Sequence, residues 1–305
     1  MSTESLTLTH GCSLSNLPLF VAEAAGLFAD EGLEVHAPPF HTMSATADAL
    51  ATGVADLGTA AFVQPLIDAG RTNPPVLVAG SGLMGVTVLA QPGTADVAEL
   101  VGRPVGTFRG DPLEVLLHDV LAAAGLGLTD VELRYCDDIA DAMAAFTRGD
   151  LAGITLAEPH AGRLRAGGAV LLSDGTELWG DPFPDTVLVA SARMVAERPA
   201  VVAAAIRAVL RAEELIAQDL RRAVGWSTAQ FPGYGLDELT QAAARQPPCV
   251  DIRPLVPTVL ERWPSLQSLG LVPAGAPVPD HALDLTLLSA ELTATYTPTR
   301  EGQTA

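Results

Sequence analysis

The first 36 residues change from an alternating pattern to a helical one and back. Residues 6–10 alternate apolar and polar side chains, as a half-buried strand does. Apolar residues then recur at 17, 20, 21 and 24, the spacing of a helix that lies on a sheet, and Ser15 or Asn16 is placed to cap it. A shorter strand pattern returns over residues 33–36. This opening therefore predicts a strand, a helix and a second strand.

The alternation of strands and helices continues to about residue 190. We expect strands over 55–58, 76–79, 104–108, 131–135, 152–156, 169–172 and 185–190, a further apolar run over 85–89, and helices over 44–52, 63–69, 95–101, 113–124, 139–146 and 160–164. The later chain has helical spacing over 200–222, 236–244, 255–263 and 281–295, with Pro, Gly and Ser between these segments. The order of elements predicts an α/β fold followed by C-terminal helices.

Two such α/β series imply two lobes. We expect the first lobe to contain residues 1–90 and 185–305, including the C-terminal helices, and the second lobe to contain residues 91–184. The chain would then cross between the lobes near residue 90 and again near residue 185. In open α/β sheets ligands bind beyond the ends of the strands, so the predicted ligand site is the cleft between the two lobes.

The charge balance narrows the class of partner. The chain has 36 acidic and 17 basic residues and a formal net charge of −19. Nucleic acids and anionic membrane surfaces attract clustered Lys and Arg, so we expect neither as a partner. No stretch approaches the roughly 18–20 consecutive apolar residues of a membrane span, so we expect no membrane insertion.

All the basic residues are arginine, because the chain contains no lysine. It therefore lacks the amine for a pyridoxal phosphate Schiff base and for a P-loop, and we expect no cofactor. Cys12, Cys136 and Cys249 are widely spaced and odd in number, which predicts no metal site and fits a reducing compartment. No charged start and apolar export run precede the first strand, so we expect a cytoplasmic protein.

Several short stretches, taken in order, resemble a known family. They are residues 18–22 with 26–28 and 31–35, residues 47–58 (ADALATGVADLG), residues 105–110 (VGTFRG) and the Glu158-Pro159 step. Together they resemble the solute-binding proteins of ABC importers, in the group for sulfonates, nitrate and thiamin precursors, over roughly residues 5–215. The resemblance implies the type 2 periplasmic-binding-protein fold, in which two α/β lobes hold the ligand between them.

Some relatives in this group are cytoplasmic enzymes. The yeast-type hydroxymethylpyrimidine phosphate synthase uses a lysine-bound pyridoxal phosphate, which a chain without lysine does not provide. The chain also resembles hydroxybiphenyl sulfinate desulfinase, which has a catalytic cysteine in the loop after its first strand, where Cys12 and Asn16 match. That enzyme also depends on a histidine, for which His41 is the candidate by position, and on an arginine, which is not found near Gly58.

Cys12 is the candidate reactive residue. It precedes the first helix, where backbone N–H groups and the helix dipole favour a thiolate. His10 lies two residues earlier, on the same face if the strand continues. Cys12 can act as nucleophile or proton donor with His10 or His41 as its partner. The alternative is that Cys12 lines the cleft without reacting.

Other polar residues of the first lobe are candidates for ligand binding. Ser13 and Asn16 follow the first strand, and Thr59 follows the third. Thr42 and Ser44 precede the second helix, where hydroxyls and amides can hold an oxyanion or simply cap the helix.

In the second lobe, Arg109 and Gly110 lie in a loop just before a helix. The guanidinium of Arg109 can bind a carboxylate, sulfinate or sulfonate through two hydrogen bonds. Alternatively, it pairs with Asp111 or Glu114 on the surface.

Glu158 and His160 flank a proline at a strand end. Glu158 can accept a hydrogen bond from a ligand amine or hydroxyl, and His160 can act as an acid or a base. The alternative is that the pair caps the following helix.

Two functions fit these residues. In the first, the protein is a cytoplasmic enzyme acting on a small anionic or aromatic acid, a desulfinase-like or decarboxylase-like lyase or a hydrolase. It would use Cys12 for chemistry and Arg109 to hold the acid group. In the second, it is a non-catalytic substrate-binding protein of an ABC importer for sulfonate-, nitrate- or pyrimidine-like ligands, with an ABC permease as partner.

Overall fold

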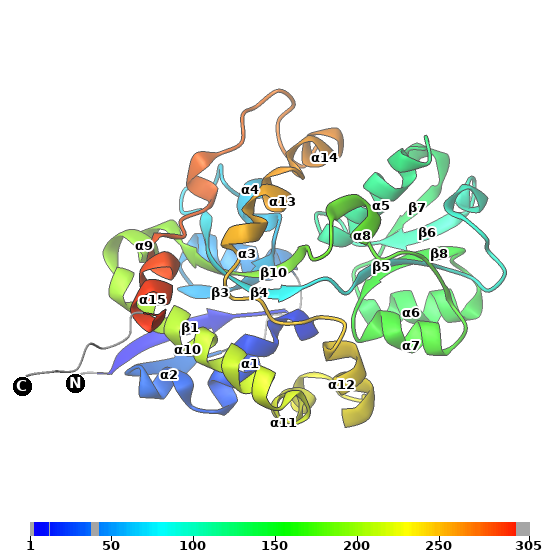
Figure 1. Ribbon diagram of the computed structural model, residues 1–305. Helices are drawn as coiled ribbons and strands as arrows, with labels where there is room; N and C mark the ends of the chain where they lie inside the picture. Colours follow the sequence, from blue (N-terminus) through cyan, green and yellow to red (C-terminus); the bar gives the residue numbers. More distant parts are fainter. Residues whose placement is uncertain (1–2, 12, 38–42, 297–305) are drawn as a thin grey trace, which may run out of the picture.

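The computed structural model describes residues 3–11, 13–37 and 43–296. These residues form two five-stranded sheets with helices packed against them, and the sheets lie in separate lobes (Figure 1). None of the helices in these ranges is both long and apolar enough to span a membrane. The expected α/β fold with two lobes is confirmed.

The first sheet belongs to the lobe that contains the start of the chain. Its strands, in spatial order, are β2 (Leu33–His36), β1 (Glu4–Thr9), β3 (Leu57–Ala61), β10 (Pro184–Ser191) and β4 (Pro75–Leu83). β1 runs parallel to β2 and β3, whereas β10 runs antiparallel to β3 and β4. Every residue of β10 and β4 is buried, which requires helices on both faces of this sheet.

Helices cover the two faces of the first sheet. One face packs against α1 (Leu17–Ala24) and α10 (Pro199–Gln218), and the other against α3 (Met43–Thr52) and α4 (Gln64–Ile67) (Figure 1). The short helix η1 (Leu14–Asn16) leads into α1, and Ser13 caps it. Three further helices pack against α10: α2 (Leu27–Asp30), α9 (Ala192–Glu197) and α15 (Thr286–Tyr296).

The second sheet has the strand order β7 (Glu132–Tyr135), β6 (Pro104–Thr107), β8 (Gly153–Ala157), β5 (Val86–Ala90) and β9 (Val170–Ser173). α5 (Pro112–Ala123) contacts β5, β6 and β8, and α6 (Ile139–Arg148) and α7 (His160–Ala166) contact β8. A separate apolar cluster that includes Phe146, Ile154 and Leu164 lies under α6 and α7. The remaining short elements are η2 (Val97–Leu100), η3 (Leu128–Asp130) and α8 (Thr176–Trp179).

The chain crosses between the lobes earlier than the expected position near residue 90. β5 (Val86–Ala90) pairs with β8 and β9 in the second sheet, so the crossing is at Met84 and Gly85. A side chain at Gly85 would meet Gln246, because a Cβ there would lie 2.1 Å from Cγ of Gln246. The return crossing leads into β10, as the sequence predicts near residue 185.

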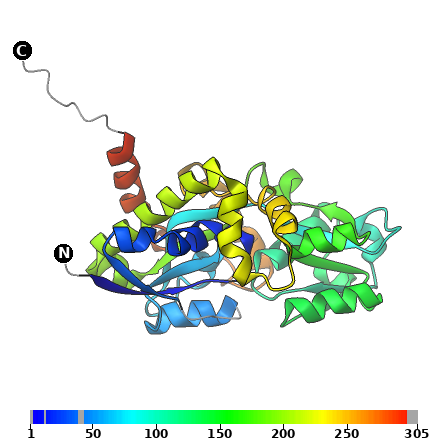
Figure 2. The same ribbon diagram turned by 90° about the horizontal axis from the view of Figure 1, so that it is seen from below.

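The C-terminal helices are shorter and more numerous than expected. They are α11 (Leu220–Ser227), η4 (Thr228–Gln230), α12 (Leu236–Ala243), η5 (Arg253–Leu255), α13 (Val256–Leu260), α14 (Trp263–Ser268) and η6 (Asp280–Ala282). The expected single helix over 200–222 ends at Gln218, and Asp219 caps a new one. α12 lies close to the second lobe, and α11 packs between α12 and α1 (Figure 1 and Figure 2).

Candidate ligand site between the two lobes

The loop after β1 is held by hydrogen bonds to one carbonyl. Asn16 donates its Nδ2–H to the Gly11 oxygen (2.9 Å), and Nδ1 of His10 donates to the same oxygen (3.1 Å). His10 is buried and packs edge-on against Phe20, with ring centroids 5.0 Å apart. The ring of His10 is therefore in contact with the core of the first lobe, and Asn16 fixes the turn into α1.

Several expected site residues lie outside the described residues. Cys12, His41 and Thr42 are among them, and so is the side chain of Ser44, although its backbone begins α3. The pairing of Cys12 with either histidine therefore stays a prediction.

The chain reaches a buried carboxylate where it re-enters the first sheet. Asp185, the second residue of β10, is 6% exposed. Its Oδ2 accepts a hydrogen bond from Nε2 of Gln246 (3.0 Å) and one from Oγ1 of Thr186 (3.4 Å). Oγ1 of Thr186 also lies 2.6 Å from Oγ of Ser15, at the start of η1. Asp185 thus connects β10, the β1–α1 loop and the residues after α12.

Burial raises the pKa of Asp185 to about 7. The charge of Asp111 acts in the same direction, while hydrogen bonds from Ser15, Thr186 and Gln246 favour the carboxylate and act in the opposite direction. Asp111 belongs to the second lobe, where it caps α5 by accepting from the backbone N–H of Leu113 (2.9 Å). Burial also raises the pKa of Asp111, to about 6. Two carboxyl groups from opposite lobes are therefore within electrostatic reach of each other.

The loop before α5 places Arg109 at the surface of the second lobe. Its guanidinium lies over the ring of Tyr135, 3.8 Å from the centroid. Glu114 accepts from the backbone N–H of Gly110 (2.6 Å) and from the hydroxyl of Tyr135 (2.5 Å). Among the described residues, Arg109 has no carboxylate within ion-pair distance, so the surface pairing with Asp111 or Glu114 is not observed.

Glu158 and His160 are engaged by protein groups. Glu158 is 1% exposed and forms ion pairs with Arg165 and, through Oε1, with Nε of Arg245 (2.7 Å). Its Oε2 accepts from the backbone N–H of Gly162 in the first turn of α7 (3.1 Å), as the helix-capping alternative expects. Nδ1 of His160 forms a hydrogen bond with the hydroxyl of Tyr234 (2.6 Å). Burial, with the charge of Arg163, lowers the pKa of His160 to about 4, so the imidazole is neutral near pH 7.

Hydrogen bonds and ion pairs join the lobes on two sides. On one side, α7 meets the region of α12 through Glu158–Arg245, Arg163–Glu238 (2.8 Å) and His160–Tyr234. On the other side, Asp119 of α5 accepts from Arg262 (3.0 Å) and from Ser265 (2.7 Å), near and within α14.

Three polar atoms of the first lobe are buried without a hydrogen-bond partner among the described residues. They are Oδ1 of Asn16, Oγ1 of Thr59 and Oε1 of Gln246. The amide of Gln246 is oriented by its nitrogen, which donates to the Met84 oxygen and to Asp185, both at 3.0 Å. The expected residues Asn16 and Thr59 therefore lie in the interior of the lobe with free hydrogen-bonding capacity.

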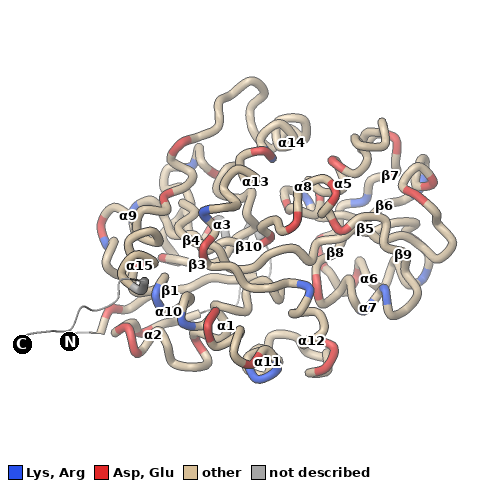
Figure 3. The backbone as a smooth tube through the Cα atoms, viewed as in Figure 1, with Lys and Arg blue, Asp and Glu red and all other residues tan. Residues whose placement is uncertain are grey.

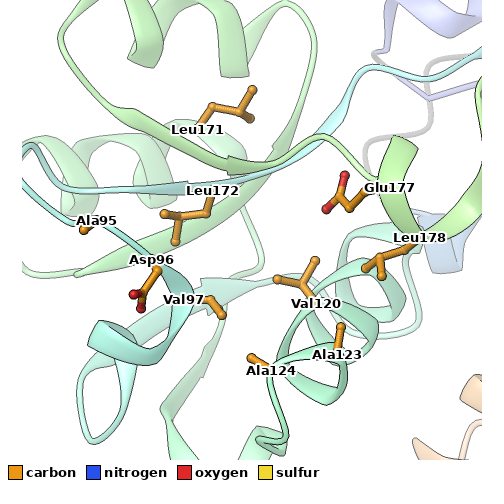
Figure 4. A pocket seen from close by; sticks show the side chains of 10 residues that line it. All are labelled: Ala95, Asp96, Val97, Val120, Ala123, Ala124, Leu171, Leu172, Glu177 and Leu178. Atoms are coloured by element: carbon orange, nitrogen blue, oxygen red, sulfur yellow. The ribbon is translucent and has the colours of Figure 1, made fainter.

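A surface pocket lies elsewhere, in the second lobe (Figure 4). It encloses about 330 Å³ between η2, α5, β9 and α8. Apolar side chains line most of it, with two carboxylates at the edge: Ala95, Asp96, Val97, Val120, Ala123, Ala124, Leu171, Leu172, Glu177 and Leu178. No residue predicted from the sequence to bind ligand lines this pocket.

Sequence reasoning missed Asp185, Thr186 and Gln246. Asp185 lies in an apolar segment that was interpreted only as a strand, and Gln246 follows a helix 61 residues later. A buried acidic residue in an otherwise apolar strand was the available signal. Asp111 was considered only as a partner of Arg109.

The chain is similar to a described protein family and to several named proteins. Residues 14–223, more than half of the chain, match the family described as NMT1/THI5 like. A curated relative from Brucella abortus, named "Putative binding protein", is 25% identical over 200 residues, which cover 64% of this chain and 61% of the relative. The chain thus matches about three-fifths of the length of such relatives.

Solved structures share the fold. The alkanesulfonate-binding protein SsuA from Xanthomonas axonopodis pv. citri, bound to MOPS, has a TM-score of 0.78 and 22% identity, covering 93% of this chain and 99% of that one. The desulfurization enzyme DszB has a TM-score of 0.72 and 18% identity, covering 96% and 99%. At these identities the similarity confirms the expected two-lobed binding-protein fold. The function has to be argued from the residues of the site.

Proposed function

We propose that this chain, which belongs to the NMT1/THI5-like family, is a non-catalytic binding protein that holds a small organic ligand between its lobes for an ABC importer. The main support is the junction itself, where the buried Asp185 is bound only by neutral groups among the described residues, and the buried Oε1 of its neighbour Gln246 has no partner among them. A ligand held by groups from both lobes stabilises their closed arrangement. The names of several relatives, as binding proteins, agree with this role.

The ligand proposed for this site carries an acidic group. Arg109 is exposed, has no carboxylate partner among the described residues, and stands two residues before the cap of α5. An exposed guanidinium without a carboxylate partner can bind a sulfonate or carboxylate through two hydrogen bonds. The name of SsuA, as an alkanesulfonate-binding protein, supports this class of ligand.

A thermal-shift screen tests the proposal. Sulfonates, sulfinates, aromatic acids and pyrimidines are added to the purified protein, and each compound that raises the Tm is incubated with it and recovered. A ligand present at 100 times its Kd stabilises the folded state by about 2.7 kcal/mol, which is easily detected. We expect an acid to raise the Tm and to be recovered unchanged. Chemical conversion of the bound compound contradicts the non-catalytic role.

A second candidate is the cytoplasmic, desulfinase-like enzyme that uses Cys12. It is favoured by the loop around Cys12, where His10 and Asn16 bond to the same carbonyl and fix the turn into α1. Rapid alkylation of Cys12 near pH 7, blocked by ligand, together with loss of turnover in Cys12→Ser, supports it. Turnover that is unchanged in Cys12→Ser excludes the cysteine mechanism, and cell fractionation tests the cytoplasmic location.

A further inference from the structure

Asp185 is a buried carboxyl group without a cationic partner. Its hydrogen bonds come from neutral groups, the amide of Gln246 and the hydroxyl of Thr186. No arginine in the part of the chain that the structure describes forms an ion pair with Asp185 or with Asp111. Buried carboxylates are normally paired, because an isolated buried charge is costly.

The protein has few means of supplying that cation. The chain has no lysine, and its acidic positions are spread over both lobes (Figure 3). At the junction, Arg245 is paired with Glu158 and Arg163 with Glu238, while Arg109 lies over the ring of Tyr135. None of these described arginines forms an ion pair with Asp185, so a bound ligand can supply the positive charge.

Independent evidence for a missing donor comes from the side-chain amide beside Asp185. Gln246 is 1% exposed, and both hydrogen bonds of its Nε2 are made within the protein. Its Oε1 is buried and accepts nothing among the described residues. The same holds for Oδ1 of Asn16, next in sequence to the Ser15 whose hydroxyl bonds to Thr186. Amide oxygens only accept, so the group that satisfies them donates hydrogen bonds.

From these contacts we propose that the ligand carries a protonated amine or amidine group, which binds Asp185 and the free oxygen of Gln246. An ammonium group offers three hydrogen-bond donors and an amidinium four. Each also brings the positive charge that could pair with the carboxylate of Asp185. The proposal deepens the proposed function, on which it rests, because it defines the end of the ligand opposite the acidic group.

Matched ligands test this directly by isothermal titration calorimetry. ω-Aminoalkanesulfonates of two to four carbons are compared with alkanesulfonates of the same chain length, which differ by the amine alone. We expect the best aminosulfonate to bind at least about tenfold more tightly than its counterpart. Asp185→Asn should abolish this preference. Asp137→Asn removes an exposed carboxylate of the second lobe and should retain it.

The outcomes separate the two proposals. Equal affinity of the two series for the wild-type protein overturns the amine site and leaves the acid-binding function intact. A preference that persists in folded Asp185→Asn also overturns it. If neither series binds, 1-aminoalkanes are titrated next. Binding that depends on Asp185 then supports the amine site and contradicts the acidic ligand class, whereas no binding overturns the amine site.

Discussion

Glu158 of the second lobe and Arg245 of the first lobe form an ion pair across the junction, with Nε and Oε1 2.7 Å apart. The carboxylate is almost completely buried and also pairs with Arg165 of its own lobe. It therefore neutralises arginines from both lobes at once, which ties α7 to the residues that follow α12. From its chemistry and position, the sequence suggested either a ligand contact or helix capping for Glu158, and in the structure its oxygens bind protein groups.

Removing this carboxylate should destabilise the protein. We expect Glu158→Gln to lower the free energy of unfolding by about 2–4 kcal/mol, because two partly buried arginines lose their partner. Glu197→Gln is the control, since its pair with Arg193 is exposed and 3.9 Å long, and it should cost less than about 0.5 kcal/mol. Urea denaturation measures the free energy of unfolding of both variants. Equal decreases would show that the buried ion pair stabilises the protein no more than the exposed one.

Asp185→Asn should raise the free energy of unfolding of the ligand-free protein, and more so at high pH than at low pH. The pKa of Asp185 is about 7 in the folded chain, against 3.8 for an unperturbed carboxyl. Between these values the folded chain holds a proton that the unfolded chain has released, so the free energy of unfolding falls with rising pH. Each pKa unit is worth about 1.4 kcal/mol, so we expect a gain on the order of 2–4 kcal/mol at pH 8 and a smaller gain at pH 5.

Thermal unfolding of Asp185→Asn at pH 5 and pH 8 measures this difference. Asp137→Asn serves as a control for the loss of one negative charge. A stabilisation that is the same at both pH values would mean that Asp185 ionises normally in the folded protein.

His160 should stay neutral over the range in which histidines usually titrate. Its pKa is lowered to about 4 by burial and by the charge of Arg163. We expect its ring proton resonances, assigned from the missing signal in His160→Gln, to be constant from pH 8 to pH 5.5. A titration midpoint near pH 6.5 contradicts this and would restore His160 as an acid or base.

Arg109→Ala should weaken the binding of an acidic ligand about tenfold. A charge-assisted hydrogen bond is worth about 1.5–3 kcal/mol, and Arg109 has no competing carboxylate among the described residues. Arg103→Ala is the matched control, because Arg103 is exposed and its guanidinium contacts only the carbonyl of Glu99, at 3.4 Å. If calorimetry gives equal affinities for the two variants, the acid group binds elsewhere.

The sequence predicted secondary structure well where residues close together in the chain determine it. The strand, helix and strand of the first 36 residues are present as β1, α1 and β2 within a few residues. Caps explain the finer errors. Asp219 starts α11 where one long helix was expected, and the prolines in the first turns of α13 and α14 start two helices in place of one.

The candidate site was harder to predict, because its contacts join distant parts of the chain. Asp185 and Gln246 meet only after β10 and α12 have packed, and neither has a local pattern that points to the other. Arg109 could be proposed from the sequence because a cation in a loop before a helix is a local signal. The earlier crossing likewise follows from the pairing of β5 with the distant strands β8 and β9.

A crystal structure with the tightest ligand from the screen tests the central claim most directly. The account predicts that the ligand lies between the lobes and contacts both, with Asp185 or Asn16 on one side and Arg109 or Asp111 on the other. A ligand bound to one lobe only, for example in the pocket between α5 and β9, would contradict it.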